Sequence, residues 1–160
     1  TIEFWIKNKR QRLLEVLKAV DIFIANEKEA RLLAKESNLV KAAKKIISYG
    51  AKKVIIKKGE HGVIYFSKKS HFIAPAYLLE SIYDPTGAGD TFAGGFVAHL
   101  SKTKDFSFNN MKSAIILGSA LASFCVEKFG TQRLTEINES DIKARVQSFV
   151  QLVNFDIELV

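Results

Sequence analysis

The chain has 160 residues, a length typical of one domain, and 48% of them are hydrophobic, enough for a packed core. Its single cysteine, Cys125, excludes an internal disulfide and lies in an apolar helical stretch, where we expect a small buried side chain. Without a disulfide framework, the sequence favours a reducing, cytoplasmic location. Its apolar runs are far shorter than the roughly 20 residues of a membrane span, so we expect no membrane partner.

The net charge is positive, but the basic residues are scattered along the sequence. The 24 Lys and Arg against 17 Asp and Glu give a formal net charge of +7. Many lysines come in isolated pairs, at 44–45, 52–53, 57–58 and 68–69. Nucleic-acid-binding segments usually have longer basic runs with interleaved aromatic residues, and this sequence has none. We therefore expect no nucleic-acid partner, and a surface that attracts small anions such as nucleotides.

The first half of the sequence alternates helical and strand patterns. We expect a helix at 9–20, a strand at 21–26, helices at 27–36 and 37–50, and a strand at 52–59. Leucines at helical spacing indicate the first helix. Ser37 or Asn38 is expected to cap the helix at 37–50, and Gly50 to stop it.

The second half begins with a turn at 59–62. Two strands are expected within 63–79, and the turn signals between them predict a hairpin or meander. Helices are expected at 91–101, at about 109–128 and from near Ser140. This order favours an α/β fold with a mainly parallel sheet and a β-hairpin segment. No Pro/Gly/Ser-rich linker interrupts it, so we expect a single domain at 1–160. Few strands precede residue 83, so either the sheet is small or the chain is the second half of a larger protein.

A glycine-rich loop precedes the helix at 91–101, in the segment YDPTGAGDTFAGGF at 83–96. Gly87 and Gly89 allow backbone conformations closed to other residues, and Ala88 keeps the middle of the loop small. Successive N–H groups of such a loop can converge on one anion, and the start of the next helix adds positive partial charge. The loop is therefore predicted to hold a phosphate or a developing oxyanion.

Asp90 adds a negative charge to this predicted anion site. A carboxylate there is useful if it takes a proton from an attacking hydroxyl while the amides stabilise the transferred group, as phosphoryl transfer requires. The structural alternative is that Asp90 caps the helix and the glycines only make room. The P-loop and dinucleotide-binding motifs are excluded, because Asp90–Thr91 replaces Lys-Ser/Thr and the glycine spacing is wrong.

At this loop the sequence resembles the ribokinase-like (PfkB-type) carbohydrate kinases, whose C-terminal signature is D-[TS]-x-G-A-G-D-x-F. NEKEARLL at 26–33 matches the N-x-x-E element of that family, and VIIKKGEHGVIYF at 54–66 matches its strand–G-x-x-G–strand element. The resemblance covers about the second half of a family member. It implies a ribokinase-like three-layer α/β/α fold in which the N-terminal substrate and lid portion is absent from this sequence.

The resemblance also implies roles for the residues of the glycine loop. Asp90 matches the catalytic base of the family, and Gly87, Ala88 and Gly89 with the Asp90 amide match its anion hole. Asp84 and Thr86 match a loop that binds a monovalent cation in some members. Pro85 replaces the usual Ser or Thr and removes one N–H, which leaves potassium dependence open.

Further residues match the nucleotide site of the family. Asn26 and Glu29 match the N-x-x-E pair, which acts on the phosphates through Mg²⁺ and water. Their spacing places both on one face of a helix start, where Asn26 can also be the N-cap. Lys57 is either a point charge for a phosphate or a solvated strand residue. The remaining matches are Gly59 and Gly62 along the nucleotide, Thr86 near it, and Ser119 beside the adenine.

The resemblance thus implies an ATP- and Mg²⁺-dependent kinase that phosphorylates an alcohol group of a sugar or nucleoside by direct in-line transfer. Because the family holds the acceptor mainly with its N-terminal half, we expect this chain alone to show little or no turnover. The alternative is a non-catalytic nucleotide-binding fragment that self-associates through an uncovered sheet edge. A homodimer is the expected oligomer.

Overall fold

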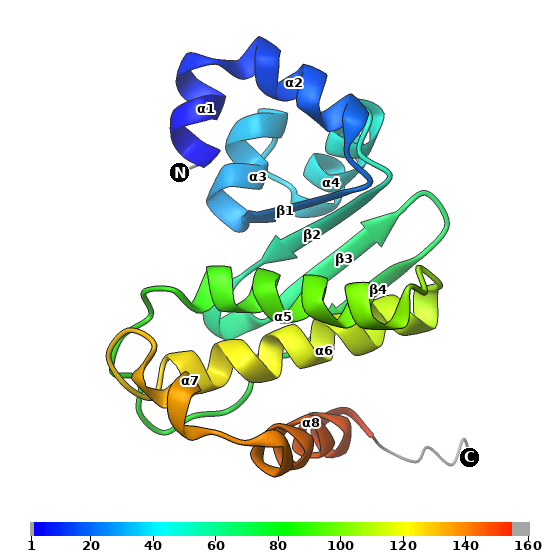
Figure 1. Cartoon of the computed structure of the whole chain (residues 1–160). Helices are drawn as coiled ribbons and strands as arrows, with labels where there is room; N and C mark the ends of the chain where they lie inside the picture. Colours follow the sequence, from blue (N-terminus) through cyan, green and yellow to red (C-terminus); the bar gives the residue numbers. More distant parts are fainter. Residues whose placement is uncertain (1, 155–160) are drawn as a thin grey trace, which may run out of the picture. The chain divides into compact units, whose positions relative to one another are not determined.

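The computed structural model describes residues 2–154, so Thr1 and residues 155–160 lie outside the described part. Contacts between Cα atoms divide the chain into two compact units, residues 1–76 and residues 77–160 (Figure 1). The single domain expected at 1–160 stays a prediction.

The first unit contains a four-stranded sheet. Its strands are β1 (Ile22–Asn26), β2 (Lys53–Lys57), β3 (Val63–Ser67) and β4 (His71–Ala74), and its helices are α1 (Ile2–Asn8), α2 (Arg10–Ala19), α3 (Glu27–Ala34) and α4 (Leu39–Ser48). The strand order is β1-β2-β3-β4; β1 and β2 are parallel, and the other two pairs are antiparallel. The described sheet is therefore mixed rather than mainly parallel, because short turns join β2, β3 and β4 as a meander.

The core of this unit lies between the sheet and two helices. Phe23 and Ala25 of β1 pair in register with Val54 and Ile56 of β2, and alternation along a strand places all four on one face. These side chains are buried together with residues of α3 and α4, which lie against the sheet (Figure 1). The alternating pattern in the sequence thus becomes the inner face of a helix–sheet pair.

Side-chain caps start both of these helices. Asn26 and Glu29 form a capping box at the start of α3, in which Asn26 Oδ1 accepts from the Glu29 amide at 2.8 Å and Glu29 Oε2 accepts from the Asn26 amide at 3.0 Å. At α4, Asn38 Oδ1 accepts from the Lys41 amide at 3.0 Å. Of the two predicted caps, Asn38 is therefore the one that is used.

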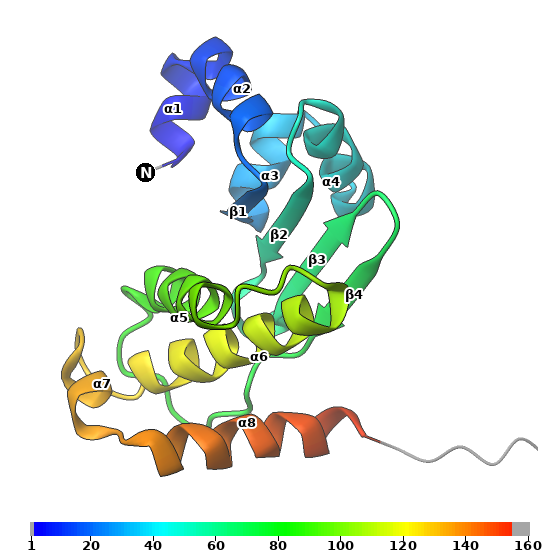
Figure 2. The same ribbon diagram turned by 45° about the vertical axis from the view of Figure 1, so that its right-hand side comes forward.

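The second unit is helical. It contains α5 (Ala88–Thr103), α6 (Phe108–Cys125), α7 (Gln132–Glu136) and α8 (Glu139–Val153). Figure 2 shows α5 beside α6, and α8 running along α6. A Cβ atom added at Gly118 of α6 would lie 2.7 Å from the Phe92 carbonyl oxygen of α5, so this close approach requires glycine. Between residues 2 and 154, no helix combines the length and apolarity needed to cross a bilayer.

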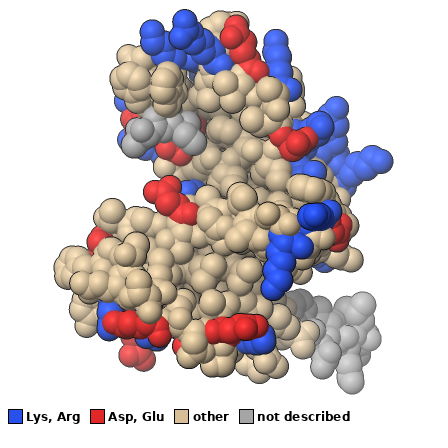
Figure 3. All heavy atoms as spheres, in the orientation of Figure 1, with Lys and Arg blue, Asp and Glu red and all other residues tan. Residues whose placement is uncertain are grey.

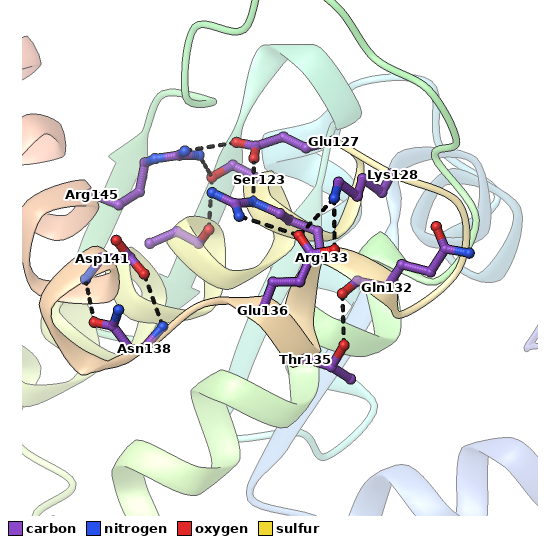
Figure 4. A network of polar contacts seen from close by, with 11 residues as sticks. Ser123, Glu127, Lys128, Gln132, Arg133, Thr135, Glu136, Asn138, Asp141 and Arg145 are labelled. Atoms are coloured by element: carbon purple, nitrogen blue, oxygen red, sulfur yellow. Dashed lines mark hydrogen bonds and ion pairs between the residues drawn. The ribbon is translucent and has the colours of Figure 1, made fainter.

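A polar network joins α6, α7 and α8 around Arg145 (Figure 4). Arg145 donates to Ser123 Oγ and to Glu127 Oε1, each at 2.7 Å, and its guanidinium carbon lies 3.8 Å from the centroid of the Phe124 ring. The other carboxylate oxygen of Glu127 accepts from Arg133 Nε at 3.0 Å. Glu127 thereby links α7 and α8 at the end of α6.

We expect Arg145→Met to lower the free energy of unfolding by about 1–3 kcal/mol, because it leaves the Glu127 carboxylate and the Ser123 hydroxyl short of a donor in a partly buried site. The Arg145 side chain is only 13% exposed. The matched control is Lys143→Met on the same helix, because Lys143 pairs with Glu139 at 2.8 Å with both side chains at least 75% exposed. The control should leave urea unfolding, followed by circular dichroism, unchanged. Equal effects of the two variants would contradict the structural role of the network.

Candidate active site

In the first unit, predicted site residues meet at the carboxyl end of the parallel strand pair. Asn26 is the last residue of β1 and pairs in register with Lys57, the last residue of β2. Glu29 lies in the first turn of α3, which begins directly after Asn26. Ligands of open α/β sheets bind outside the carboxyl ends of the strands, so this edge is a suitable place for a charged ligand.

The capping box limits what Asn26 and Glu29 can do for a metal ion. Asn26 Oδ1 and Glu29 Oε2 are engaged in the cap, whereas Glu29 Oε1 makes no hydrogen bond with the described residues. In the described part of the chain, no three His, Cys, Asp or Glu side chains gather as a metal site. The donor set therefore fits Mg²⁺ held through water, which this ion prefers, and does not fit a cage of protein ligands.

The turn after β2 contains two glycines with different environments. Gly59 has a φ of +58° and open space around it. Gly62 has a φ of +81°, and a Cβ atom there would lie 2.1 Å from the Ala74 carbonyl oxygen. The packing of the turn against the end of β4 by itself requires glycine at 62. The predicted contact of both glycines with a nucleotide stays a prediction.

In the second unit, the glycine loop leads directly into α5. Gly87 is the N-cap of this helix, with a left-handed φ of +84° and no side-chain cap. The helix begins at Ala88, three residues before the predicted start at Thr91. The Ala88 amide donates to the Pro85 carbonyl at 3.3 Å, whereas the amides of Gly87, Gly89 and Asp90 have no acceptor among residues 2–154. Three donors next to the positive end of the helix therefore remain available to an anion.

Asp90 lies in the first turn of α5 and is exposed to solvent. Its carboxylate makes no hydrogen bond or ion pair with the residues described, so the helix-capping alternative has no support from the geometry. Because the Asp90 carboxylate is unpaired, it could accept a proton from the hydroxyl group of a substrate.

Asp84 organises the loop that precedes the glycines. Its Oδ1 accepts from the Thr86 amide at 2.9 Å, and its Oδ2 accepts from the Gly130 amide at 3.5 Å. Hydrogen bonds from Thr86, and then from Gly130, lower the pKa of the Asp84 carboxyl below its usual value. Asp84 therefore stays ionised into the acid range and ties residues 84–86 to the segment after α6. Its role with a monovalent cation stays a prediction.

Ser119 lies on α6 and is 9% exposed, and its hydroxyl oxygen is buried without a hydrogen-bond partner in the described structure. The predicted contact with adenine is not tested by this geometry. An unpaired buried hydroxyl is uncommon, because leaving it unpaired has an energetic cost.

Charge is divided unevenly between the two units. Residues 1–76 contain 17 of the 24 Lys and Arg but only 7 of the 17 Asp and Glu. Figure 3 shows more basic than acidic side chains at the top and right-hand edge of the first unit, whereas acidic and basic side chains are mixed over α7 and α8. The excess positive charge therefore belongs to the unit that carries Asn26, Glu29 and Lys57, where it favours an anionic ligand.

The structure thus brings the predicted site residues together as two groups, one in each unit. The first comprises Asn26, Glu29, Lys57 and the turn at 59–62, and the second comprises residues 84–90. Sequence reasoning did not predict the contacts that support the second group, which join Cys125 to Thr86 and Gly130 to Asp84. The only available signal was a glycine shortly after an apolar helix, which is too common to indicate this contact.

A comparison with protein-family models matches residues 3–138 to the pfkB family of carbohydrate kinases. This chain belongs to the pfkB carbohydrate kinase family. The match covers both groups of site residues, and the ribokinase-like resemblance of the sequence is thereby confirmed.

Individual pfkB relatives include sugar and nucleoside kinases. The chain is 36% identical over 134 residues to a ribokinase of Staphylococcus aureus, covering 78% of this chain and 42% of that protein. It is 35% identical over 134 residues to a cytidine kinase of Thermococcus kodakarensis, covering 83% of this chain and 46% of that protein. The chain therefore spans less than half the length of the curated relatives it matches.

Similar solved structures confirm the α/β fold class. A ribokinase of Thermotoga maritima superimposes with a TM-score of 0.72 at 30% identity, covering 84% of this chain and 44% of that one. An E. coli protein assigned as a ribokinase II, solved with ATP and Mg²⁺, gives a TM-score of 0.74 at 28% identity, covering 92% of this chain and 46% of that one.

Proposed function

We propose that this chain carries the nucleotide-binding and catalytic-base half of an ATP-dependent kinase that phosphorylates a hydroxyl of a sugar or nucleoside. The observation that carries the proposal is the start of α5. Three loop amides are unpaired among residues 2–154, and the exposed Asp90 carboxylate has no partner there. Membership of the pfkB family supports phosphoryl transfer as the reaction, and the ribokinase and cytidine kinase relatives support a sugar or nucleoside as the acceptor.

In the proposed reaction, Asp90 accepts the proton of the acceptor hydroxyl as its oxygen attacks the terminal phosphorus of ATP. A new bond forms between that oxygen and phosphorus, the bond from phosphorus to the bridging oxygen breaks, and ADP leaves. The amides of Gly87, Gly89 and Asp90 donate to the phosphoryl oxygens, on which negative charge is spread in the transition state. Transfer is direct, so no phospho-enzyme forms.

The first unit is proposed to act on the nucleotide phosphates. Lys57 supplies a positive point charge at the end of β2, and Glu29 is the residue that would hold Mg²⁺ through water with its unengaged oxygen. When bound, Mg²⁺ neutralises phosphate charge. Asn26 keeps α3 in place through the capping box, so its role in this proposal is to orient Glu29.

Other parts of the proposal rest on the resemblance alone. They are a monovalent cation at Asp84 and contacts of Thr86, Gly59, Gly62 and Ser119 with the nucleotide. A cytoplasmic location is proposed from the lack of a disulfide framework, and a homodimer from the uncovered edge of the sheet. A second candidate is a non-catalytic nucleotide-binding fragment that self-associates. One observation favours it: β1 ends the sheet, and its outer edge has no strand partner in the part of the chain that is described.

We expect residues 1–160 to bind MgATP. When ribose, adenosine or cytidine is added, ADP release should not exceed the background rate measured without protein. Binding is measured by ¹⁵N NMR, where saturable shifts of the amides of Gly87, Gly89 and Asp90 are expected. Turnover is measured by an ADP-coupled assay.

The amide of Ile137, at the end of α7, serves as an internal control, because it donates to Arg133 within its own segment and should not shift. No saturable shift at residues 87–90 would overturn the anion site. Strong turnover stimulated by one acceptor would contradict the expected need for an N-terminal portion.

A further inference from the structure

The thiol of Cys125 lies directly beneath the glycine loop. Cys125 is the last residue of α6 and is 1% exposed. Its Sγ lies 3.7 Å from the Thr86 carbonyl oxygen and 3.6 Å from the Gly130 carbonyl oxygen. A Cβ atom added at Gly87 would lie 3.6 Å from the same sulfur, so the thiol lies on the side of Gly87 from which a side chain would project.

The two carbonyls belong to segments far apart in the sequence. Among the hydrogen bonds of residues 2–154, Cys125 makes one of three links between these segments. The Tyr83 amide donates to the Val126 carbonyl at 2.9 Å, and the Gly130 amide donates to Asp84 Oδ2 at 3.5 Å. These two links hold the beginning of the loop. The thiol is the link nearest to the amides of the proposed anion site.

The geometry of one peptide group connects this link to the proposed anion site. The Thr86 carbonyl and the Gly87 N–H belong to the same peptide unit, which is planar and trans, so the two bonds point in opposite directions. Because the carbonyl oxygen faces Cys125 Sγ in the interior, the Gly87 N–H faces away from the protein core. Rotation of this peptide would turn the N–H inward, and the proposed anion site would lose a donor.

We propose that Cys125 is a positioning residue that fixes the direction of the Gly87 amide. The thiol has one proton and donates it weakly to one of the two carbonyls at a time, while its large sulfur lies where a Cβ atom of residue 87 would point. This inference rests on the proposed function for its consequence in binding. The orientation of the amide can be tested without any ligand.

The experiment compares Cys125→Ser, Cys125→Ala and Cys125→Val in residues 1–160. Serine keeps a donor, alanine removes both donor and bulk, and valine keeps apolar bulk without a donor. The residual dipolar coupling of the Gly87 N–H, measured without ligand, reports the direction of that bond. We expect it to change in the alanine and valine variants and to be retained in the serine variant. The coupling of the Ile137 N–H is the internal control and should not change.

For MgATP affinity we expect a loss of about threefold or more in the alanine and valine variants and recovery with serine, as for the loss of one weak hydrogen bond. Should valine prove too large for the chain to fold, the alanine and serine pair gives the same contrast. A Gly87 coupling that stays unchanged in Cys125→Ala overturns the proposal and leaves Cys125 as a core side chain. If the couplings change as expected but the wild-type chain does not bind MgATP, the proposed function fails and the positioning role stands.

Discussion

Replacing Asp90 by asparagine is expected to lower kcat by about 10²–10⁴-fold, the range that a general base contributes to such reactions. The variant keeps the size of the side chain and removes its ability to accept a proton. The assay needs an acceptor pocket, so residues 1–160 are joined to the N-terminal half of the Staphylococcus aureus ribokinase, and ribose-dependent ADP release is measured. Affinity for MgATP, measured in residues 1–160, should stay within about threefold, because only one exposed charge is removed.

The matched control is Asp105→Asn, which makes the same chemical change in the same unit. Asp105 lies just beyond the far end of α5 and accepts hydrogen bonds from Ser107. We expect turnover of this variant to equal that of the unsubstituted protein. A loss of less than about tenfold in Asp90→Asn, or an equal loss in the control, would remove Asp90 from the role of base. A fall in thermal stability with unchanged kcat would restore the helix-capping interpretation.

Replacing Gly62 by alanine should lower the free energy of unfolding by about 3–5 kcal/mol, among the largest effects of a single substitution. The new Cβ atom would lie 2.1 Å from the Ala74 carbonyl oxygen and 2.6 Å from the Pro75 carbonyl carbon, at a φ of +81° that alanine rarely adopts. Both obstacles are backbone atoms, so relief requires β4 to move away from the turn at 59–62. Urea unfolding followed by the fluorescence of Trp5, the single tryptophan, reports on this unit.

Gly59→Ala is the control within the same turn. Its φ of +58° is also left-handed, but a Cβ atom there has no neighbour within 4 Å. We expect a cost of about 1–2 kcal/mol, the strain of a left-handed alanine without a clash. Similar losses in the two variants would show that conformation alone, and not the contact with the end of β4, requires glycine at 62.

Helix starts were largely predictable, because their signals lie within a few residues of each other. Asn26 with Glu29 three residues later predicts a cap, and both capping hydrogen bonds are present. The start of α5 was predicted three residues too late. The sequence shows that Gly87 can adopt φ > 0, but not that it becomes the N-cap, since that depends on what the loop packs against.

The sequence did not predict α1, because this helix also depends on packing with other parts of the chain. Residues 2–8 form α1, although the apolar stretch there is too short to show a helical period. Contacts with α2 and α3 support this helix, and packing contacts of this kind have no local signal.

By itself, the sequence determined the family, the α/β class and the position of the glycine-rich loop, because a signature of nearby residues encodes local backbone shape and local chemistry. Only the tertiary structure decided that Asp84 and Cys125 tie the loop to the segment after α6. The same holds for Gly62, where contact with residues 74–76 requires glycine. These contacts join residues up to 46 positions apart, and the folded backbone, not the spacing in the chain, sets the distance between them.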